Sequence, residues 1–340
     1  MTPSLAFADA LRRILGREDL TRAETEALFG ELMDGAFDAA QKAALLVGLA
    51  MKGESPAEIA GAAAAMRRRV VAIPHRRADA IDTCGTGGDG RGTFNVSTAA
   101  ALVAAAGGAA VAKHGNRSVS SRSGSADVLG ALGVALEVAP EVAGRALDEI
   151  GIAFLFAPAL HPAMREVMPV RRALGVRTVF NLLGPLTNPA GARRQVLGVY
   201  ARERVEPLAR VLLELGAEHA LVVHGADGLD EITTTGPTLV AEVRDGGVTT
   251  FELRPEDLGV ERTPLEALSG GTPEENARRM EALLAGDGEP ALAAVTALNA
   301  GAGLYVAGRA PSLRAGVDAA RDLLAAGAGA RKLAELRSYR

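Results

Sequence analysis

The sequence has little of what an exported or membrane-bound protein needs. Its 340 residues include a single cysteine, Cys84, so no disulfide can form within the chain, as is typical of a reducing compartment. The longest apolar run, residues 99–112, is rich in alanine and glycine and too short to cross a bilayer. Residues 1–15 mix apolar and charged side chains and do not resemble a signal peptide. We therefore expect a cytoplasmic protein without a membrane partner.

Aromatic residues and net charge are also scarce. Aromatics make up 3% of the chain and tryptophan is absent, so the core has to be built mainly from alanine, leucine and valine. The hydrophobic share of 48% and the charged share of 23% are those of an ordinary folded protein. A net charge of −4 argues against a nucleic-acid partner, since such proteins usually carry a basic surface. An anionic ligand would need local donors, local cations or a metal.

Two kinds of pattern divide the chain. Residues 1–72 predict four helices and no strand; the first covers residues 4–15, and three capping boxes begin at Thr21, Asp38 and Ser55. Further along, strands alternate with helices, which indicates βαβ units and a mainly parallel sheet. The predicted strands are 80–82, 109–113, 152–156, 195–200, 220–223 and two within 238–253, and the helices near them include 96–106, 142–150, 205–215 and a series after Thr272.

The expected fold class is α/β, with two domains. A small all-helical domain covers residues 1–72, and we expect residues 165–185 to complete it. The larger α/β domain covers residues 73–164 and 186–340, with helices around a mainly parallel central sheet. The segment 169–189 interrupts the strand–helix alternation and is expected to cross between the two parts.

The first motif that carries chemistry is DTCGTGGDGRGTFNVST, residues 82–98. A strand runs into a glycine-rich turn and then into the start of a helix. Glycines let backbone N–H groups approach an anion, and the helix N-terminus adds partial positive charge. The motif lacks the lysine ending of a P-loop and the glycine spacing of a dinucleotide fingerprint. It predicts a pyrophosphate site, and the plainer alternative is an ordinary strand–helix turn.

A second polar motif, KHGNRSVSSRSGSAD at residues 113–127, also follows a strand. Lys113 and Arg117 lie among several hydroxyls and small residues. A cation about 4 Å from a phosphate contributes roughly 4 kcal/mol at intermediate dielectric, far more than the weak net charge can. The motif predicts a loop that binds phosphate and closes over it. The alternative is a solvated polar loop.

The third motif, GADGLDEITTTG at residues 225–236, places Asp230 and Glu231 after a strand. Ligands of open α/β sheets collect at the carboxyl ends of the strands. Mg²⁺ is usually held by one or two carboxylates together with phosphate and water. An acidic pair alone is commonly just solvated, but beside two phosphate motifs it predicts a metal site.

The fourth motif runs from His161 to Pro189 and contains four arginines, at positions 165, 171, 172 and 177. Arginine binds carboxylates and phosphates through two parallel hydrogen bonds. The residues themselves do not choose among the four. Three histidines, at positions 114, 161 and 224, are candidate bases, although each is more typical of a structural histidine.

Taken in this order, the four motifs resemble those of the anthranilate phosphoribosyltransferases. The resemblance extends to LNAGAGLYVAG at residues 298–308, and its departures are small: Arg91 replaces a lysine, and Gly301 and Gly303 replace alanines. It implies a homodimer with the active site between a helical and an α/β domain. The implied reaction joins anthranilate to 5-phosphoribosyl 1-pyrophosphate (PRPP) in tryptophan biosynthesis.

The resemblance also implies residue roles. Lys113, Asp230 and Glu231 would be catalytic, and Ser97 would join the two acids in holding Mg²⁺, with two ions per subunit. Anthranilate would contact Gly85, Asn116 and Arg171, the last facing its carboxylate. The implied PRPP contacts are Gly85, Gly88, Asp89, Thr93, Asn95, Val96, Ser97, Thr98, Lys113, His114, Gly115, Asn116, Arg117, Ser118, Val119, Ser120, Ser121 and Ser125.

Two other functions are compatible with this type of fold. A pyrimidine nucleoside phosphorylase shares the phosphate loop, but it has less need of an acidic pair for Mg²⁺. A non-catalytic nucleic-acid-binding relative would need a basic groove, which the net charge of −4 disfavours.

Overall fold

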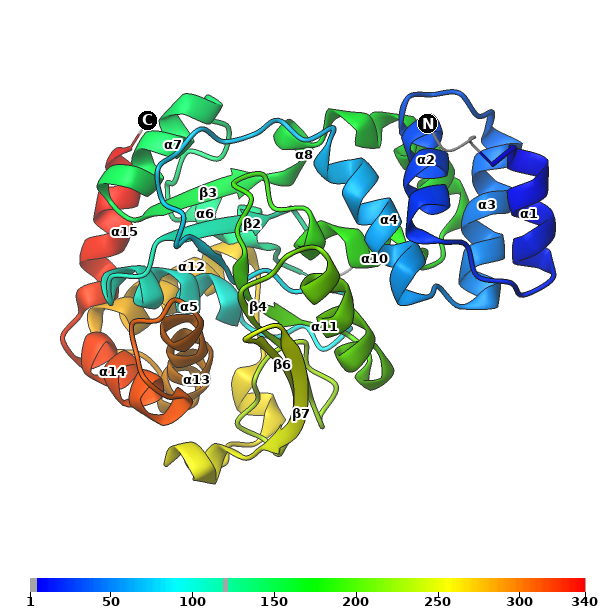
Figure 1. The fold of residues 1–340 in the computed structure, drawn as a ribbon. Coiled ribbons are helices and arrows are strands. Elements are labelled where there is room, and N and C mark those ends of the chain that lie inside the picture. The colour runs from blue at the N-terminus through cyan, green and yellow to red at the C-terminus, as the bar shows by residue number, and fades with distance from the viewer. Residues whose placement is uncertain (1–4, 119–121, 340) are drawn as a thin grey trace.

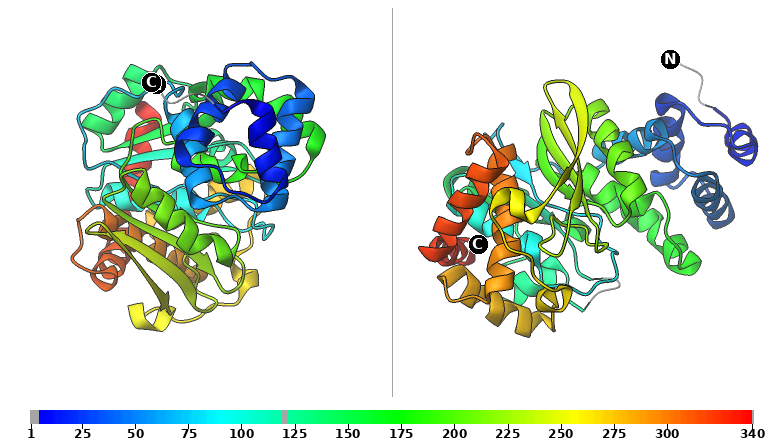
Figure 2. Two further views of the ribbon diagram at one scale, coloured as in Figure 1. Left: turned by 45° about the vertical axis from the view of Figure 1, so that its right-hand side comes forward. Right: turned by 90° about the horizontal axis from the view of Figure 1, so that it is seen from below.

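The computed structural model describes residues 5–118 and 122–339. The implied PRPP contacts at Val119, Ser120 and Ser121 therefore lie outside the described residues. A small group of helices at the N-terminal end stands beside a larger part built around a sheet (Figure 1). Figure 2 shows the same two parts from two further directions.

The N-terminal part consists of four helices, as the sequence predicts. Each predicted capping box forms: the side chains of Thr21, Asp38 and Ser55 accept the N–H of the third helical residue, whose side chain bonds back. The first helix begins at Phe7, later than the predicted Ser4, which lies outside the described residues. The bounds are α1 Phe7–Leu15, α2 Arg22–Met33, α3 Ala39–Lys52 and α4 Pro56–Arg67.

The larger part contains a seven-stranded sheet in the order β3-β2-β1-β4-β5-β6-β7. The first five strands are parallel, and β6 and β7 form an antiparallel hairpin at the edge, so the mainly parallel sheet is confirmed. Strand β2 begins two residues later than predicted, because Ala109 N–H still bonds to Ala104 O at the end of the preceding helix. The bounds are β1 Ile81–Asp82, β2 Val111–Gly115, β3 Ile152–Phe156, β4 Arg194–Gly198, β5 His219–Gly225, β6 Thr238–Arg244 and β7 Gly247–Leu253.

Helices cover both faces of this sheet. Within the described residues, no helix is both long and apolar enough to cross a membrane. The predicted helix 96–106 is confirmed residue for residue as α5. The bounds are α5 Val96–Ala106, α6 Ser125–Ala131, α7 Pro140–Glu149, α8 Ala157–Leu160, α9 Met168–Leu174, α10 Phe180–Leu183, α11 Val205–Glu214, α12 Pro273–Ala285, α13 Pro290–Val306, α14 Leu313–Ala325 and α15 Ala328–Ser338, with short 3-10 turns η1 Pro162–Glu166, η2 Gly184–Leu186, η3 Arg202–Arg204, η4 Pro255–Leu258 and η5 Leu265–Leu268.

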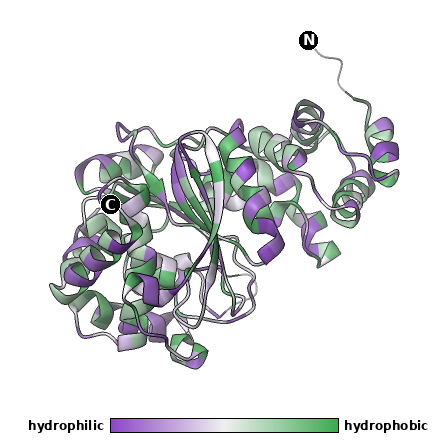
Figure 3. Ribbon diagram, turned by 60° about the horizontal axis from the view of Figure 1, so that its bottom comes forward, coloured by the Kyte–Doolittle hydropathy of each residue, from purple (hydrophilic) through white to green (hydrophobic). Residues whose placement is uncertain are grey.

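Alternate strand residues enter different cores. Leu221 and Val223 of β5 pack into the core formed with α5 and the C-terminal helices. Ala220 and Val222 of the same strand face the opposite core, which continues into the N-terminal helices. Most helices in Figure 3 carry hydrophobic residues on one side and hydrophilic residues on another, as expected for packing by one face. One face of the sheet is therefore continuous with the helical part.

The segment after β3 leads from the sheet to the helical part and back. Helix α9 packs against α3, and α10 packs against α4. Lys42 of α3 donates to the Glu166 carbonyl at 2.9 Å and to its carboxylate at 3.2 Å. These contacts support the predicted division, in which residues 165–185 complete a helical domain formed by residues 1–72. The division itself stays a prediction.

Candidate active site

Four neighbouring parallel strands, β1, β2, β4 and β5, have their carboxyl ends at the same edge of the sheet. Strand β1 lies between β2 and β4. The strands that follow β1 in sequence, β2 and β3, extend the sheet in one direction, and β4 and β5 extend it in the other. Such a switch point is where α/β sheets bind ligands. A Cβ on Gly198, the last residue of β4, would lie 1.5 Å from Asp230 O, and one on Gly85, after β1, would lie 2.7 Å from Asp230 Oδ2. Only glycine lets the ends of β1 and β4 approach the acidic residues this closely.

The glycine-rich loop, residues 85–92, has a shape that other residues would rarely adopt. Gly87, Gly88, Gly90 and Gly92 have φ values between +62° and +77°. Within the described part of the chain, the N–H groups of Gly88, Asp89 and Gly90 donate no hydrogen bond. Residues 87, 88 and 90 are exposed. The loop therefore offers backbone donors to an incoming anion, as a pyrophosphate site requires.

Helix α5 begins beside this loop, but its first side chains point in different directions. Asn95 is engaged by other residues: its Nδ2 donates to Ser123 O at 3.0 Å, and its Oδ1 accepts from Asn276 Nδ2 at 2.9 Å. Val96 and Thr98 are each 1% exposed, so their side chains do not face the loop. Ser97 contacts the acidic pair through its backbone, because its N–H donates to Glu231 Oε1 at 3.1 Å.

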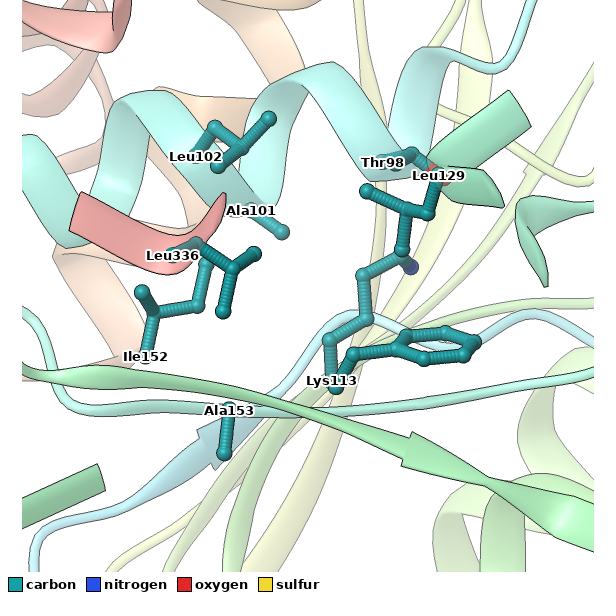
Figure 4. A pocket seen from close by; sticks show the side chains of 9 residues that line it. Thr98, Ala101, Leu102, Lys113, Leu129, Ile152, Ala153 and Leu336 are labelled. Carbon is teal, nitrogen blue, oxygen red and sulfur yellow. The ribbon is translucent and has the colours of Figure 1, made fainter. Parts of the chain in front are cut away.

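Lys113 reaches the same place from β2. Its side chain is 3% exposed and passes a small apolar cavity on its way toward Thr98 of α5 (Figure 4). The ammonium group donates long hydrogen bonds to Ser97 Oγ and Thr83 O, both at 3.4 Å. Burial therefore fixes the aliphatic part of the Lys113 side chain, and its ammonium group lies at the start of α5. The structure thus brings Lys113 and Ser97 together.

The described residues of the serine-rich loop, 116–118 and 122–124, follow β2 and are organised by Asp127. The Asp127 carboxylate accepts from the N–H groups of Ser118 and Gly124, both at 2.9 Å, and pairs with Arg117 at 3.2 Å. Ser125 Oγ donates to Asn116 O at 3.3 Å and accepts from its N–H. Burial by itself would raise the pKa of Asp127, but these hydrogen bonds and the charge of Arg117 together lower it. Asn116 and Arg117 are exposed, and Asp127 fixes the backbone next to them.

The acidic loop, residues 225–235, follows β5 and carries the predicted metal pair. Asp230 Oδ2 accepts from Gly87 N–H at 2.8 Å, so the acidic loop touches the glycine-rich loop. Burial is the largest cause that raises the pKa of Asp230, to about 6, and Asp89 adds to it. Burial and the nearby Asp230 also raise the pKa of Glu231 well above its ordinary value. Asp230 therefore lies close enough to Glu231 to oppose its ionisation.

These donors fit Mg²⁺. Two carboxylates and the Ser97 hydroxyl supply the oxygen atoms that this ion prefers. The raised pKa values of both carboxylates show that burial and mutual repulsion oppose the charged forms, and a divalent cation would remove that repulsion. The same strand edge carries the free N–H groups of the glycine-rich loop, so phosphate oxygens would complete the coordination.

Another potential metal-binding group in the described residues is already satisfied. Asp82, Cys84 and His114 bring one ligand atom each to within 4.8 Å of one another. Asp82, however, accepts from Asn188 Nδ2 at 2.7 Å and from His114 N–H at 3.2 Å. Burial raises the pKa of the Cys84 thiol, which keeps it protonated. This group therefore serves to hold β1, β2 and the segment before β4 together.

The candidate histidines are neutral or structural. His114 and His161 face each other, with 3.1 Å between their Nε2 atoms, and His114 Nδ1 bonds to Gly184 O. Because a carbonyl accepts, His114 carries its proton on Nδ1 and His161 carries its proton on Nε2. Burial lowers the pKa of His114 to about 3 and that of His161 to about 4. His224 bonds to Val199 O at 2.8 Å.

The four arginines differ in their surroundings. Arg171 is half-buried over the Phe180 ring, with 5.6 Å to its centroid, and makes no ion pair with any described residue. Burial lowers its pKa. Arg177 stacks 4.1 Å from the centroid of the Tyr200 ring and donates to Gly88 O in the glycine-rich loop. Arg165 bonds to Pro162 O and to no other described residue, and Arg172 is exposed.

The structure therefore joins four parts into one site: the glycine-rich loop, the start of α5 with Ser97, Lys113, and the acidic pair Asp230 and Glu231. No described hydrogen bond or ion pair connects Arg171 with Gly85 or Asn116. Sequence reasoning missed Gly198 and Asn299, and it listed Arg177 only among four arginines without its contact with Gly88; all three contact residues far along the chain. Asn299 lies in the segment that carries the family resemblance, which is the only signal that could have drawn attention to it.

Comparisons with known proteins match this architecture. Residues 8–70 match the glycosyl transferase family, helical bundle domain, and residues 77–330 match the glycosyl transferase family, a/b domain. The anthranilate phosphoribosyltransferase of Symbiobacterium thermophilum is 53% identical over 97% of this chain and 96% of its own length. The crystal structure of the Thermus thermophilus enzyme is 51% identical with a TM-score of 0.93, covering 97% of this chain and 99% of that one.

A more distant relative has been solved with ligands. The anthranilate phosphoribosyltransferase of Saccharomyces cerevisiae is 26% identical and has been solved in complex with PRPP and Mg, with a TM-score of 0.88 over 98% of this chain and 97% of that one. It has also been solved in complex with 4-fluoroanthranilate. Fold, motifs and identity over almost the whole length agree: this chain belongs to the anthranilate phosphoribosyltransferase family.

Proposed function

We propose that the protein transfers the phosphoribosyl group of PRPP to anthranilate, giving N-(5-phosphoribosyl)anthranilate and pyrophosphate in tryptophan biosynthesis. The observation that carries this proposal is the meeting of two unlike loops at the sheet edge. One has backbone N–H groups that bond to no described residue, and the other has a carboxylate pair that burial and repulsion disfavour in its charged form. Membership of the family removes the nucleoside phosphorylase and nucleic-acid-binding alternatives.

The donor would be bound by its phosphates. The glycine-rich loop offers the N–H groups of Gly88, Asp89 and Gly90, and helix α5 adds the partial positive charge of its N-terminus. Lys113 supplies a full positive charge at the same helix end. The buried side chains of Val96 and Thr98 indicate that these two residues would contribute through their backbone alone.

Asp230, Glu231 and Ser97 would hold Mg²⁺, which when bound neutralises the charge of the departing pyrophosphate. We propose two ions per subunit, because Asp89 lies close enough to raise the pKa of Asp230 and adds a third carboxylate to the region. Titration calorimetry with PRPP present should give a stoichiometry near two. A value near one would remove the second ion from the proposal.

The acceptor would be recognised by Arg171. A half-buried guanidinium without an acidic partner among the described residues is suited to a ligand carboxylate, and anthranilate carries one. The Phe180 ring beneath it limits where the guanidinium can lie. Asn116 stands on the exposed serine-rich loop and would contact anthranilate when that loop closes.

The bond changes balance without a strong base. The bond between ribose C1 and the pyrophosphate oxygen breaks, and its electron pair leaves with pyrophosphate. The lone pair of the anthranilate amine forms the new bond to C1, and the amine then loses one proton to the departing pyrophosphate or to water. The residues of the site need mainly to bind and orient the two substrates, and orientation of this kind can supply much of the rate. The neutral His114 and His161 are not required for these steps.

The proposal is tested by mixing the protein with Mg²⁺, PRPP and anthranilate and following the loss of anthranilate fluorescence. We expect the signal to fall only when all three are present, with release of one pyrophosphate per anthranilate consumed. Omitting Mg²⁺ is the matched control. A fluorescence that stays constant with folded protein and both substrates at saturation would reject the proposed activity.

Arg171→Ala tests the acceptor site. Loss of a charge-assisted pair costs roughly 1.5–3 kcal/mol, so we expect the KM for anthranilate to rise at least tenfold. The KM for PRPP should change little, because the side-chain contacts of Arg171 on α9 are with Met168 and Phe180 and not with described residues of the phosphate loops. Equal increases in both constants would show that Arg171 has another role.

We also propose that the protein is a homodimer joined through its outermost helices. Leu15 at the end of α1 and Met51 at the end of α3 are 71% and 73% exposed, although both are large and apolar. Contacting helices carry them at the far end of the molecule from the sheet (Figure 1). Light scattering should give twice the chain mass, and Leu15→Lys with Met51→Lys should give one chain mass. The cytoplasmic location stays a prediction.

A further inference from the structure

Helix α13 carries a buried polar residue that the reaction as described above does not use. Asn299 lies in the middle of the helix and is 3% exposed. Its Oδ1 accepts from Ile232 N–H at 3.0 Å, and its Nδ2 donates to Ile232 O at 2.8 Å. Nδ2 also donates to Val295 O, one turn earlier in its own helix, at 2.9 Å. One side chain therefore binds both backbone groups of the residue that follows Glu231.

Asparagine is a costly choice at such a position. It is a poor helix former, and a buried amide lowers stability unless its polar atoms are paired. Here its oxygen and nitrogen are both paired, and the partner is the backbone of the acidic loop. An apolar residue in its place would leave the buried N–H and C=O of Ile232 without these bonds, which is unfavourable for both groups.

The other side of the metal pair is held in a similar way by Asp227. Its Oδ2 accepts from the hydroxyls of Thr233 at 2.5 Å and Thr235 at 2.6 Å. Its Oδ1 accepts from Leu229 N–H at 3.0 Å. Asp227 thus connects the start of the acidic loop to its end. Asn299 fixes Ile232, which lies between Leu229 and Thr233 in this loop. Asp230 and Glu231 lie between these two restraints.

Helix α13 is a firm support for this purpose. A Cβ on Gly301 would lie 2.5 Å from Val317 N, so the backbones of α13 and α14 are in direct contact. A Cβ on Gly303 would lie 3.3 Å from Ala104 Cβ of α5, the helix whose first turn carries Ser97. One helix therefore packs closely against the element that bears Ser97 and binds the loop that bears the two carboxylates.

We propose that Asn299 is a positioning residue for the metal site, acting through the Ile232 backbone, with Asp227 as its counterpart at the other side of the loop. This rests on the proposed function, because Asp230 and Glu231 are metal ligands only in that reaction. Neither Asn299 nor Asp227 touches the reacting atoms. Metal ligands have to be held to within about half an ångström, and a loop needs outside support to achieve this.

The test is Asn299→Leu, measured by binding as well as by activity. Mn²⁺, followed by its electron paramagnetic resonance signal in the presence of PRPP, reports metal affinity without turnover. Loss of an outer partner typically weakens metal binding by about 10–100-fold, so we expect the Mn²⁺ Kd to rise at least tenfold. The Mg²⁺ concentration for half-maximal rate should rise by a similar factor, while the KM for anthranilate stays unchanged.

Thr296→Val is the matched control. Thr296 lies on the same helix, is fully buried and has a hydroxyl that bonds to none of the described residues. Its replacement should leave the Mn²⁺ Kd and both KM values unchanged. Asp227→Asn keeps the shape of the side chain and provides a second variant in case Asn299→Leu does not fold. It should shift the Mn²⁺ Kd in the same direction.

Failure of the positioning role and failure of the proposed function would give different results. An unchanged Mn²⁺ Kd in folded Asn299→Leu or Asp227→Asn, or an equal rise in every KM, would overturn the positioning role. A wild-type protein that binds Mn²⁺ and PRPP but does not consume anthranilate would reject the proposed function. The Mn²⁺ measurements on the variants would still decide the role of Asn299.

Discussion

The acidic loop and the glycine-rich loop meet at one edge of the sheet but are built in opposite ways. The acidic loop is held by side chains: Asp227 binds two threonines, and Asn299 binds Ile232, which is buried with Thr233 and Thr234. The glycine-rich loop has little such support, and its exposed N–H groups at residues 88 and 90 have no partner in the described chain.

The difference follows from what each loop would bind. Metal ligands have to be in place before the ion arrives, so the protein spends hydrogen bonds on fixing them. A phosphate loop has to leave its hydrogen bonds unmade until the ligand completes them. The two loops touch where Gly87 N–H donates to Asp230. This hydrogen bond connects the prearranged acidic loop to the more adaptable glycine-rich loop.

The largest effect should come from removing the charges of the acidic pair. Asp230→Asn with Glu231→Gln keeps both shapes but discards two metal ligands, so we expect turnover in Mg²⁺ to fall on the order of a thousandfold. Stability without metal should not fall, because burial and repulsion oppose both charges. Initial rates by anthranilate fluorescence and thermal unfolding in a chelator measure the two effects.

Asp245→Asn with Glu252→Gln is the control for that pair. It makes the same change of charge on the exposed β6–β7 hairpin, where both residues are solvated. The control should retain full activity. A near-normal rate in the acidic-pair variant would remove the metal assignment and, with it, the contrast between the two loops.

Much of the α/β architecture is readable from the chain itself. Helix α5 keeps its predicted bounds, and the three capping boxes form, because each depends on residues three positions apart. The acidic pair and the glycine-rich loop are also visible as motifs, since their chemistry is written in consecutive residues. Local patterns of this kind are set by neighbouring residues and need no knowledge of the fold.

The residues that hold the site in place from outside its loops could not be predicted from local sequence patterns. Asn299 binds a residue 67 positions earlier, and Arg177 donates to Gly88 across 89 positions. Neither partner follows from helix or strand periodicity, because the sheet order and the packing of α13 decide which residues meet. Gly198 reads as an ordinary strand end until the structure places Asp230 O against it.

A smaller but substantial loss should follow Gly198→Ala. Its new Cβ would lie 1.5 Å from Asp230 O and 2.4 Å from Asp230 C, so the acidic loop would have to move away. A shift near 1 Å can cost about a hundredfold in rate, and forced overpacking costs roughly 1–3 kcal/mol of stability. Steady-state kinetics across Mg²⁺ concentrations and thermal unfolding would measure both.

Gly236→Ala provides the comparison for that change. A Cβ at Gly236 meets nothing within 4 Å, and it follows the same loop. It should behave like the wild type. If Gly198→Ala also kept its rate and its Mg²⁺ dependence, the acidic loop would be more adaptable than its hydrogen bonds indicate, and the two loops would not differ in rigidity.

The smallest effect should come from the glycine-rich loop, at Arg177. Its guanidinium stacks over Tyr200 and donates to Gly88 O, and these are among the few side-chain contacts of that loop. An exposed cation–π contact and one hydrogen bond together contribute about 1 kcal/mol, so Arg177→Ala should raise the KM for PRPP about fivefold. Arg177→Lys should lose most of the same contribution, because an ammonium lacks the planar fork.

The anthranilate KM and the thermal stability of Arg177→Ala should stay close to the wild-type values. Arg172→Ala, which removes an exposed arginine on neighbouring α9, is the matched control and should leave both KM values unchanged. A PRPP KM raised a hundredfold would mean that Arg177 binds the donor directly. An unchanged one would mean that the glycine-rich loop needs no support before its ligand binds, which is the contrast with the acidic loop in its strongest form.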